Sequence, residues 1–223
     1  MSPVPRKAAP APAARPLKRP SQARARFTVQ AIYDAFVRIW QRDGWDALTT
    51  RAVALETGIA VGTLYDYFPN KAALLSGYVR HSLEALVQAI DEQAAQAAGL
   101  DWQARVRTLV RLTCGVNAPE LPWFDAGMLA LEAGIAEPKH HRRAFEELCA
   151  AWGRVLATCT DLRGPPTLSV ISPLVVAVWG GRRYALLLGL EDTAAREWAA
   201  AMETLCLSAL APTQPIQASS TDA

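Results

Sequence analysis

The sequence lacks several features that would place it among enzymes or metal proteins. Its 223 residues include four cysteines and three histidines. No Cys-x-x-Cys pair occurs, and the Gly-x-Ser-x-Gly, His-Glu-x-x-His, phosphate-loop and dinucleotide-binding motifs are missing. We therefore expect no enzyme activity, no metal and no cofactor. The widely spaced cysteines are typical of buried free thiols in a reducing cytoplasm.

Long uninterrupted apolar runs and alternating strand patterns are also scarce. The most apolar stretch, residues 168–190, is interrupted by Gly-Gly-Arg-Arg at 180–183, so we do not expect it to span a membrane. Hydrophobic residues make up 51% of the chain, which excludes a wholly disordered protein. Because apolar residues recur at three- and four-residue spacing instead, the sequence predicts an all-α fold.

Basic charge is concentrated at the beginning of the chain. Residues 1–26 contain seven lysines and arginines, no acidic residue, and many prolines and alanines. Without these seven bases the formal net charge of +2 becomes −5. This composition predicts a disordered basic arm over 1–26, with a second disordered segment over 212–223. Two interpretations of the arm stay open, a solvated leader and a segment that follows DNA phosphates or enters the minor groove.

The stretch from Leu48 to Lys71 predicts two short helices joined at a glycine. Thr49 or Thr50 can cap the first helix, because a threonine hydroxyl accepts a hydrogen bond from a first-turn amide. Gly58 can end that helix in the left-handed conformation. The side chains expected on or beside its inward stripe are Val53, Ala54, Leu55 and Thr57.

The second helix of the pair is expected to have one buried and one free face. Leu64 and Phe68 lie one helical turn apart and continue the buried side begun by Ile59. The outward face is then formed by Val61, Gly62, Thr63, Asp66 and Tyr67. Asn70 is placed to cap a further helix. This arrangement is typical of a helix-turn-helix, whose second helix enters the DNA major groove.

Residues 28–80 resemble the DNA-binding domain of the TetR family of bacterial transcriptional regulators. The resemblance, without a gap over about a quarter of the chain, is carried by Leu48-Thr49-Thr50-Arg51, the turn 58–63, Leu64-Tyr65, Tyr67-Phe68, and Asn70-Lys71 followed by Leu74. Ala60 departs from the pattern, because many members carry a polar cap there. The resemblance implies a helix-turn-helix domain over 27–72 and a helical effector-binding and dimerisation domain over 73–211.

Residue chemistry and this resemblance together give the candidate DNA contacts. Contacts with phosphates are expected from Thr49, Thr50, Tyr65, Tyr67 and Lys71. Base-edge contacts and close backbone approach are expected from Arg51, Val61, Gly62 and Thr63. For Tyr65 and Tyr67 a place in the small core of the domain is the alternative. Asp66 would repel phosphate unless it accepts a hydrogen bond from a cytosine amino group.

The remainder of the chain is predicted to be helical. After a long helix from Lys71 to about Gly99, further helices are expected over 101–116, 123–134, 140–160, 173–190 and 193–210. The helix over 173–190 is apolar almost all round, which predicts burial on more than one side. With the helix that follows, it is expected to pair with a second copy of the chain in a four-helix bundle.

Large apolar side chains in the central helices are candidates for an effector pocket. They are Trp102, Trp123, Phe124, Met128, Phe145, Trp152 and Trp179, with Glu132 as a polar anchor. The alternative for each is an ordinary place in the core. If they line a pocket, the effector is a small and largely hydrophobic molecule.

These observations predict a cytoplasmic, homodimeric, sequence-specific regulator that binds double-stranded DNA at a near-palindromic operator. Repression relieved by the effector is the favoured mode, since a dimer on a promoter blocks polymerase without further contacts. The alternatives are an activator, or a helical ligand-binding or interaction protein whose DNA specificity is lost or altered. Ala60, Val61 and Asp66 are the residues that motivate this last alternative.

Overall fold

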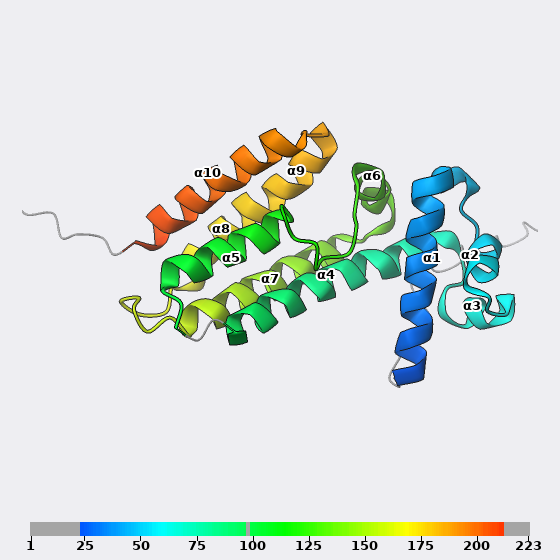
Figure 1. Ribbon diagram of the computed structural model, residues 1–223, viewed down its shortest axis with the longest axis horizontal. Coiled ribbons are helices and arrows are strands. Elements are labelled where there is room, and N and C mark those ends of the chain that lie inside the picture. Colours follow the sequence, from blue (N-terminus) through cyan, green and yellow to red (C-terminus); the bar gives the residue numbers. More distant parts are fainter. Residues whose placement is uncertain (1–22, 97–98, 212–223) are drawn as a thin grey trace, which may run out of the picture. The chain divides into compact units, whose positions relative to one another are not determined.

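The computed structural model describes residues 23–96 and 99–211. Regular secondary structure in these ranges is entirely helical, which confirms the predicted all-α class (Figure 1). The predicted tail at 212–223 and most of the predicted arm at 1–26 lie outside the described residues. The first helix begins at Ala23 and therefore includes the last four residues assigned to that arm.

The chain divides into two compact units. One extends to His81 and also includes residues 130–136, and the other consists of residues 82–129 and the chain from Glu137 onward. The first unit contains α1 (Ala23–Ala47), α2 (Thr50–Thr57), α3 (Val61–Tyr67) and the beginning of α4 (Lys71–Gln96). The second contains the rest of α4, α5 (Trp102–Cys114), α7 (Pro138–Ala157), α8 (Leu168–Val175), α9 (Gly181–Leu188) and α10 (Asp192–Leu210). The helix α6 (Ala126–Ile135) is divided between the units.

The core of the first unit is built on α1. Ile32, Phe36 and Ile39 are almost completely buried, as their helical spacing predicts. Gly44 leaves the helical conformation at φ 77° and kinks α1 near its end. The inward position predicted for Leu55 is wrong, because 83% of its surface is exposed. It follows the buried Val53 by two residues, which places it about 200° around the helix.

The second unit has a larger apolar core between α5, α7, α8 and α10. Fully buried residues at its centre include Val110, Leu148, Trp152 and Val175. The ends of α5 follow the sequence signals: Asp101 accepts a hydrogen bond from the Ala104 amide at 2.7 Å, and Gly115 ends the helix at φ 69°. Local capping chemistry therefore sets the bounds of α5.

The segment predicted to begin at Pro173 begins earlier. The helix α8 starts at Leu168 and contains Pro173, and a π-helical turn, η1 (Val176–Gly180), joins it to α9. A proline in a helix interior removes one backbone hydrogen bond, so Pro173 resembles a helix start in the sequence. By length and composition alone Leu168–Leu188 would be able to cross a membrane. Of its most apolar 18-residue stretch, 22% is buried inside this chain.

All four cysteines are free and buried, as predicted. Burial raises the pKa of the Cys114 thiol to about 12 and that of Cys206 to about 11. Because the thiolate is the reactive form, these two thiols are unreactive near neutral pH.

Candidate nucleic-acid interface

The turn between α2 and α3 is formed by local capping. The Thr49 hydroxyl accepts a hydrogen bond from the Ala52 amide at 3.0 Å, which selects Thr49 over Thr50 as the N-cap. At the other end Gly58 adopts φ 70°, and the Ile59 amide donates to the Ala54 carbonyl at 3.1 Å. A side chain other than glycine is strained at this φ, so the glycine fixes the direction in which α3 leaves the turn.

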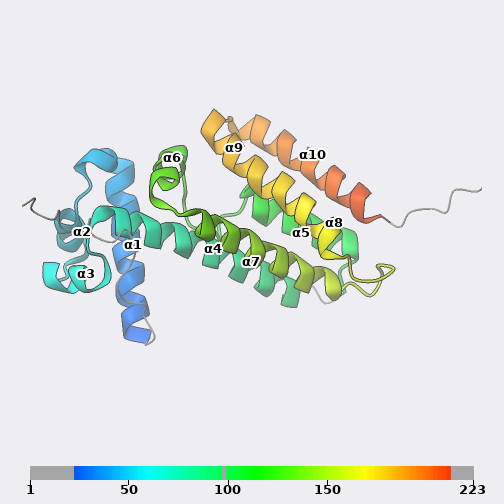
Figure 2. The same ribbon diagram turned by 180° about the vertical axis from the view of Figure 1, so that it is seen from behind.

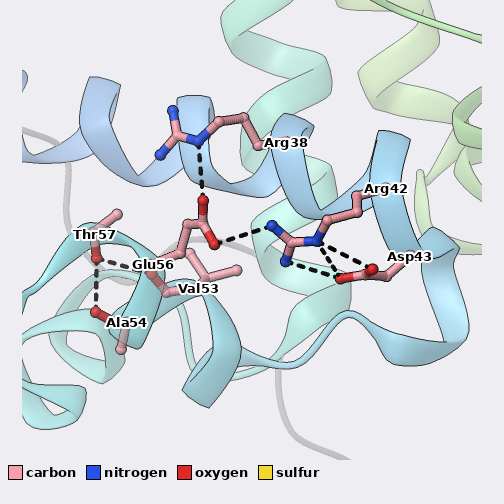
Figure 3. Close-up of polar contacts among 7 residues, drawn as sticks. All are labelled: Arg38, Arg42, Asp43, Val53, Ala54, Glu56 and Thr57. Carbon is pink, nitrogen blue, oxygen red and sulfur yellow. Dashed lines mark hydrogen bonds and ion pairs between the residues drawn. The ribbon is translucent and has the colours of Figure 1, made fainter.

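A group of ion pairs joins α1 to α2 (Figure 3). The Glu56 carboxylate accepts from Arg38 Nε at 3.1 Å and from Arg42 Nη1 at 3.4 Å, and Arg42 also pairs with Asp43. The hydrogen bond from Arg38 is the main cause of the lowered pKa of Glu56. These side chains are solvent-exposed, so each pair contributes little stability, but together they fix α2 against α1. Sequence reasoning missed this group, since its members are 14 and 18 residues apart and follow no helical repeat.

The two faces of α3 differ, although Thr63 and Tyr67, which were predicted to face outward, are half-buried. Leu64 and Phe68 are buried, with at most 1% of their surface exposed. On the opposite side Gly62 and Asp66 are exposed, and Val61, in the first turn, is 39% exposed. The backbone at Gly62 is therefore open to close approach by a groove, whereas the Asp66 carboxylate needs a cytosine amino group as its partner there.

The predicted phosphate contacts at the ends of these helices are not equally accessible. Thr50 is buried, and its hydroxyl donates to the Tyr65 hydroxyl oxygen at 3.2 Å, whereas 46% of Tyr65 is exposed. Tyr67 is half-buried and lies 6.3 Å from Phe68 between ring centroids. Tyr65 therefore offers more surface to a ligand than Thr50 or Tyr67. Thr63 is half-buried and Arg51 is exposed.

Lys71 is held by its own domain. Its ammonium group donates to the Trp45 carbonyl at 3.0 Å and lies 4.4 Å from the centroid of the Trp45 ring. An ammonium group has three N–H donors, so a phosphate contact can be made while the bond to Trp45 is kept. Asn70, next to it, caps α4 as predicted, with its side chain accepting from the Ala73 amide at 2.8 Å.

Replacing Lys71 with alanine is expected to make DNA binding less dependent on salt. Each lost phosphate contact lowers the slope of log affinity against log salt by about one unit per subunit, while sequence preference persists. Titrations at several salt concentrations measure this slope. Lys139→Ala is the matched control, because Lys139 is exposed and pairs with Glu137 in the second unit. An unchanged slope in the Lys71 variant would remove this side chain from the interface.

The residues predicted to form an effector pocket occupy different environments. Trp102, Met128 and Trp152 are buried, Trp123 is 39% exposed, and Phe124, Phe145 and Trp179 are half-buried. Glu132 is buried but belongs to the first unit. Trp152 is a core residue whose Nε1 donates to the Thr113 hydroxyl at 3.1 Å. A separate, small depression lies between α4, α5 and α7 and includes Arg105 and Thr108 in its lining.

Comparison with known proteins agrees with this geometry. Residues 32–78 match the model of "Bacterial regulatory proteins, tetR family". The HTH-type transcriptional repressor KstR of Mycolicibacterium smegmatis is 40% identical over 72 residues, which cover 32% of this chain and 35% of the repressor. The HTH-type transcriptional regulator BetI of Burkholderia thailandensis is 26% identical over 171 residues, which cover 74% of this chain and 85% of the regulator. The chain thus spans about a third of the length of KstR but most of BetI.

Solved structures share the fold of both units. A TetR transcription regulator from Haloarcula marismortui superposes with a TM-score of 0.58 at 18% identity, covering 83% of this chain and 97% of that one. FadR of Thermus thermophilus, a TetR-family repressor solved with lauroyl-CoA, gives 0.53 at 18% identity, covering 84% and 97%. Fold and site together define a helix-turn-helix regulatory protein. By the match over residues 32–78, the chain contains the DNA-binding domain of the TetR family.

Proposed function

We propose that the protein is a sequence-specific DNA-binding regulator of transcription, acting in the cytoplasm as a repressor. The observation that carries this proposal is the free face of α3. Gly62 and Asp66 are exposed on a helix whose opposite side is anchored by Leu64 and Phe68, and Val61 is exposed in its first turn. An anchored helix with an open outer face can lie against base edges without rearranging its own domain. The KstR relatives, which are named as repressors, support this direction of control.

The second part of the proposal is a homodimer formed through the last helices. Val176, Tyr184, Leu187, Leu188 and Leu205 are each at least 44% exposed in the single chain. They lie on η1, α9 and α10, and α9 and α10 are side by side in both views (Figures 1 and 2). A second copy would cover this surface in a four-helix bundle and place two α3 helices on one near-palindromic site.

A charge on this surface is expected to separate the dimer. Leu187 is 54% exposed in one chain, so Leu187→Glu leaves the folded subunit intact but places two unpaired carboxylates in the interface. Sedimentation at micromolar concentration should show a dimer for the natural protein and a monomer for the variant. Leu100→Glu is the matched control, because Leu100 is 50% exposed and lies outside these helices. A natural protein that sediments as a monomer would contradict the dimer.

The third part of the proposal is release from DNA by a small, largely hydrophobic effector. Support comes from the aromatic composition of the second unit and from FadR, which was solved with lauroyl-CoA. An effector changes DNA affinity only by binding one arrangement of the dimer more tightly than the other. In this proposal it favours an arrangement whose two α3 helices no longer match the groove spacing of about 34–36 Å.

Incubation with fragmented genomic DNA, followed by sequencing of the retained fragments, tests the proposed function. A regulator of this kind is expected to enrich a near-palindrome whose half-sites lie about one helical turn apart. Uniform retention, or none, would instead support a ligand-binding or interaction protein. The genes that flank an enriched palindrome would be the candidates for regulation.

A further inference from the structure

A cationic side chain without a carboxylate partner lies in the second unit, at the beginning of α9. Arg182 follows the π-helical turn η1, and its guanidinium carbon is 5.4 Å from the centroid of the Trp179 ring. Within the described part of the chain no acidic residue forms an ion pair with Arg182. Its charge is thus surrounded by protein but not neutralised by an anion.

The guanidinium group lies flat against Gly115, the residue that ends α5. A methyl group on Gly115 would be 2.7 Å from the guanidinium carbon and 2.9 Å from Nη2, too close for a real contact. Gly115 adopts φ 69°, a conformation that favours glycine, and a side chain there would displace the guanidinium group. The negative end of the α5 dipole faces the cation, but a helix dipole offsets only part of a full charge.

The surroundings of Arg182 raise the free energy of its charge. Desolvation lowers its pKa to about 10, with a contribution from the neighbouring Arg183, so the group is still charged at pH 7. Arg182 as a residue is only half-buried. A charged group that is largely desolvated and has no counter-ion binds an anion more strongly than a solvated one.

A second copy of the chain is poorly placed to supply that anion. Successive residues of a helix are rotated by about 100°, so Tyr184, Leu187 and Leu188 lie between about 140° and 240° around α9 from Arg182. These exposed residues form the surface proposed for dimerisation, and Arg182 faces α5 on the opposite side. A partner that covers one side of α9 leaves the other to a small molecule.

Apolar surface adjoins the cation. Trp198 on α10 lies so close to Gly181 that a methyl group there would be 2.6 Å from its ring. Trp179, Trp198 and Met202 are half-buried and pack on the core of the second unit. The same region therefore offers a planar cation and exposed parts of two indole rings, which suit an anion that carries an apolar body.

We propose that Arg182, seated on Gly115 beside Trp179, is the anion-binding group of the effector site, and that the effector is an amphipathic molecule with a carboxylate, sulfate or phosphate group. This inference rests on the proposed function for the role of the ligand, and on the surroundings of Arg182 for its chemical class. The guanidinium donates two parallel hydrogen bonds to the anion, and the apolar body contacts the tryptophans.

Binding of octanoate, octyl sulfate and octyl phosphate to the full chain tests this site, with octanol as the uncharged probe of equal length. Isothermal titration calorimetry and tryptophan fluorescence give the affinities. Arg182→Gln is expected to weaken binding of the anions by roughly 10- to 100-fold, the value of a hydrogen-bonded charge, and to leave octanol unchanged. Arg183→Gln, which removes the same charge from the adjacent position, should stay within about threefold of the natural protein.

Arg182→Lys keeps the charge but not the planar fork, and is expected to retain intermediate affinity. It also serves as the test if the glutamine variant does not fold. The site is overturned if none of the three anions binds the natural protein saturably, if octanol binds as tightly as they do, or if folded Arg182 variants bind them unchanged.

Retention of DNA is measured on the same samples, so that the two proposals fail separately. If the natural protein retains specific DNA but does not bind the anions, the proposed anion site is contradicted and the proposed regulatory function stands. If the protein binds the anions through Arg182 but retains no specific DNA, the anion site stands and the proposed regulatory function is contradicted. Release of DNA by an anion in the natural protein, absent in Arg182→Gln, supports both.

Discussion

Replacing Trp152 with alanine is expected to lower the free energy of unfolding by about 3–5 kcal/mol, because a completely buried indole is removed and the cavity cannot fully collapse. Trp152 lies at the centre of the second unit's core, and its Nε1 donates to Thr113, which is also buried. Urea or thermal unfolding of the full chain measures the loss. A decrease of this size identifies Trp152 as a core residue, the alternative considered for each aromatic residue of the central helices.

Two further variants separate packing from hydrogen bonding and from surface effects. Trp152→Phe keeps most of the ring but leaves the Thr113 hydroxyl without its donor, so a loss of about 1–3 kcal/mol is expected. Trp123→Ala, at a position that is 39% exposed, should cost about 1 kcal/mol or less. If Trp152→Ala were no more destabilising than Trp123→Ala, the indole of Trp152 would not be packed as the structure shows.

Substitution of Gly62 is expected to change folding stability and DNA affinity in opposite directions. A methyl group on Gly62 meets no atom of the protein within 4 Å, and glycine in a helix costs about 0.5–1 kcal/mol relative to alanine. Gly62→Ala should therefore stabilise the first unit slightly. Because the position faces the proposed groove, the same methyl group should weaken specific DNA binding by keeping the backbone away from the bases.

A carboxylate at the same position should abolish specific binding. Gly62→Glu places negative charge against phosphates on both subunits, and like charges in an interface cost several kcal/mol, which corresponds to a loss on the order of 100-fold or more. Thermal unfolding checks that the variant is folded, and fluorescence anisotropy with the recovered operator measures affinity. DNA binding that survives Gly62→Glu unchanged would mean that α3 does not contact DNA through this face.

The helix-turn-helix was predictable because its signals are local. Thr49, Gly58 and Asn70 each determine a helix end through one hydrogen bond or one backbone conformation within a few residues. The helix predicted to begin at 123 instead begins at Ala126. Its start is also set by a local cap, because the Asp125 side chain accepts a hydrogen bond from the Met128 amide at 2.8 Å.

Features that depend on long-range packing were not predictable. Glu56 meets Arg38 and Arg42 only after α1 and α2 have folded against each other. Arg182 reaches Gly115 across 67 positions of sequence, and no repeat or motif connects them. Six of the eight pocket candidates are aromatic residues at helical spacing, but this spacing does not distinguish a core from a cavity, and Trp152 and Trp179 occupy different environments.

The central claim is that α3 reads DNA sequence, and a paired selection experiment tests it most directly. The natural protein and Gly62→Glu are each incubated with the same fragmented genomic DNA, and the retained fragments are sequenced. The account predicts one enriched near-palindrome for the natural protein and none for the folded variant. Enrichment of the same sequence by both proteins would show that the specificity resides elsewhere in the chain.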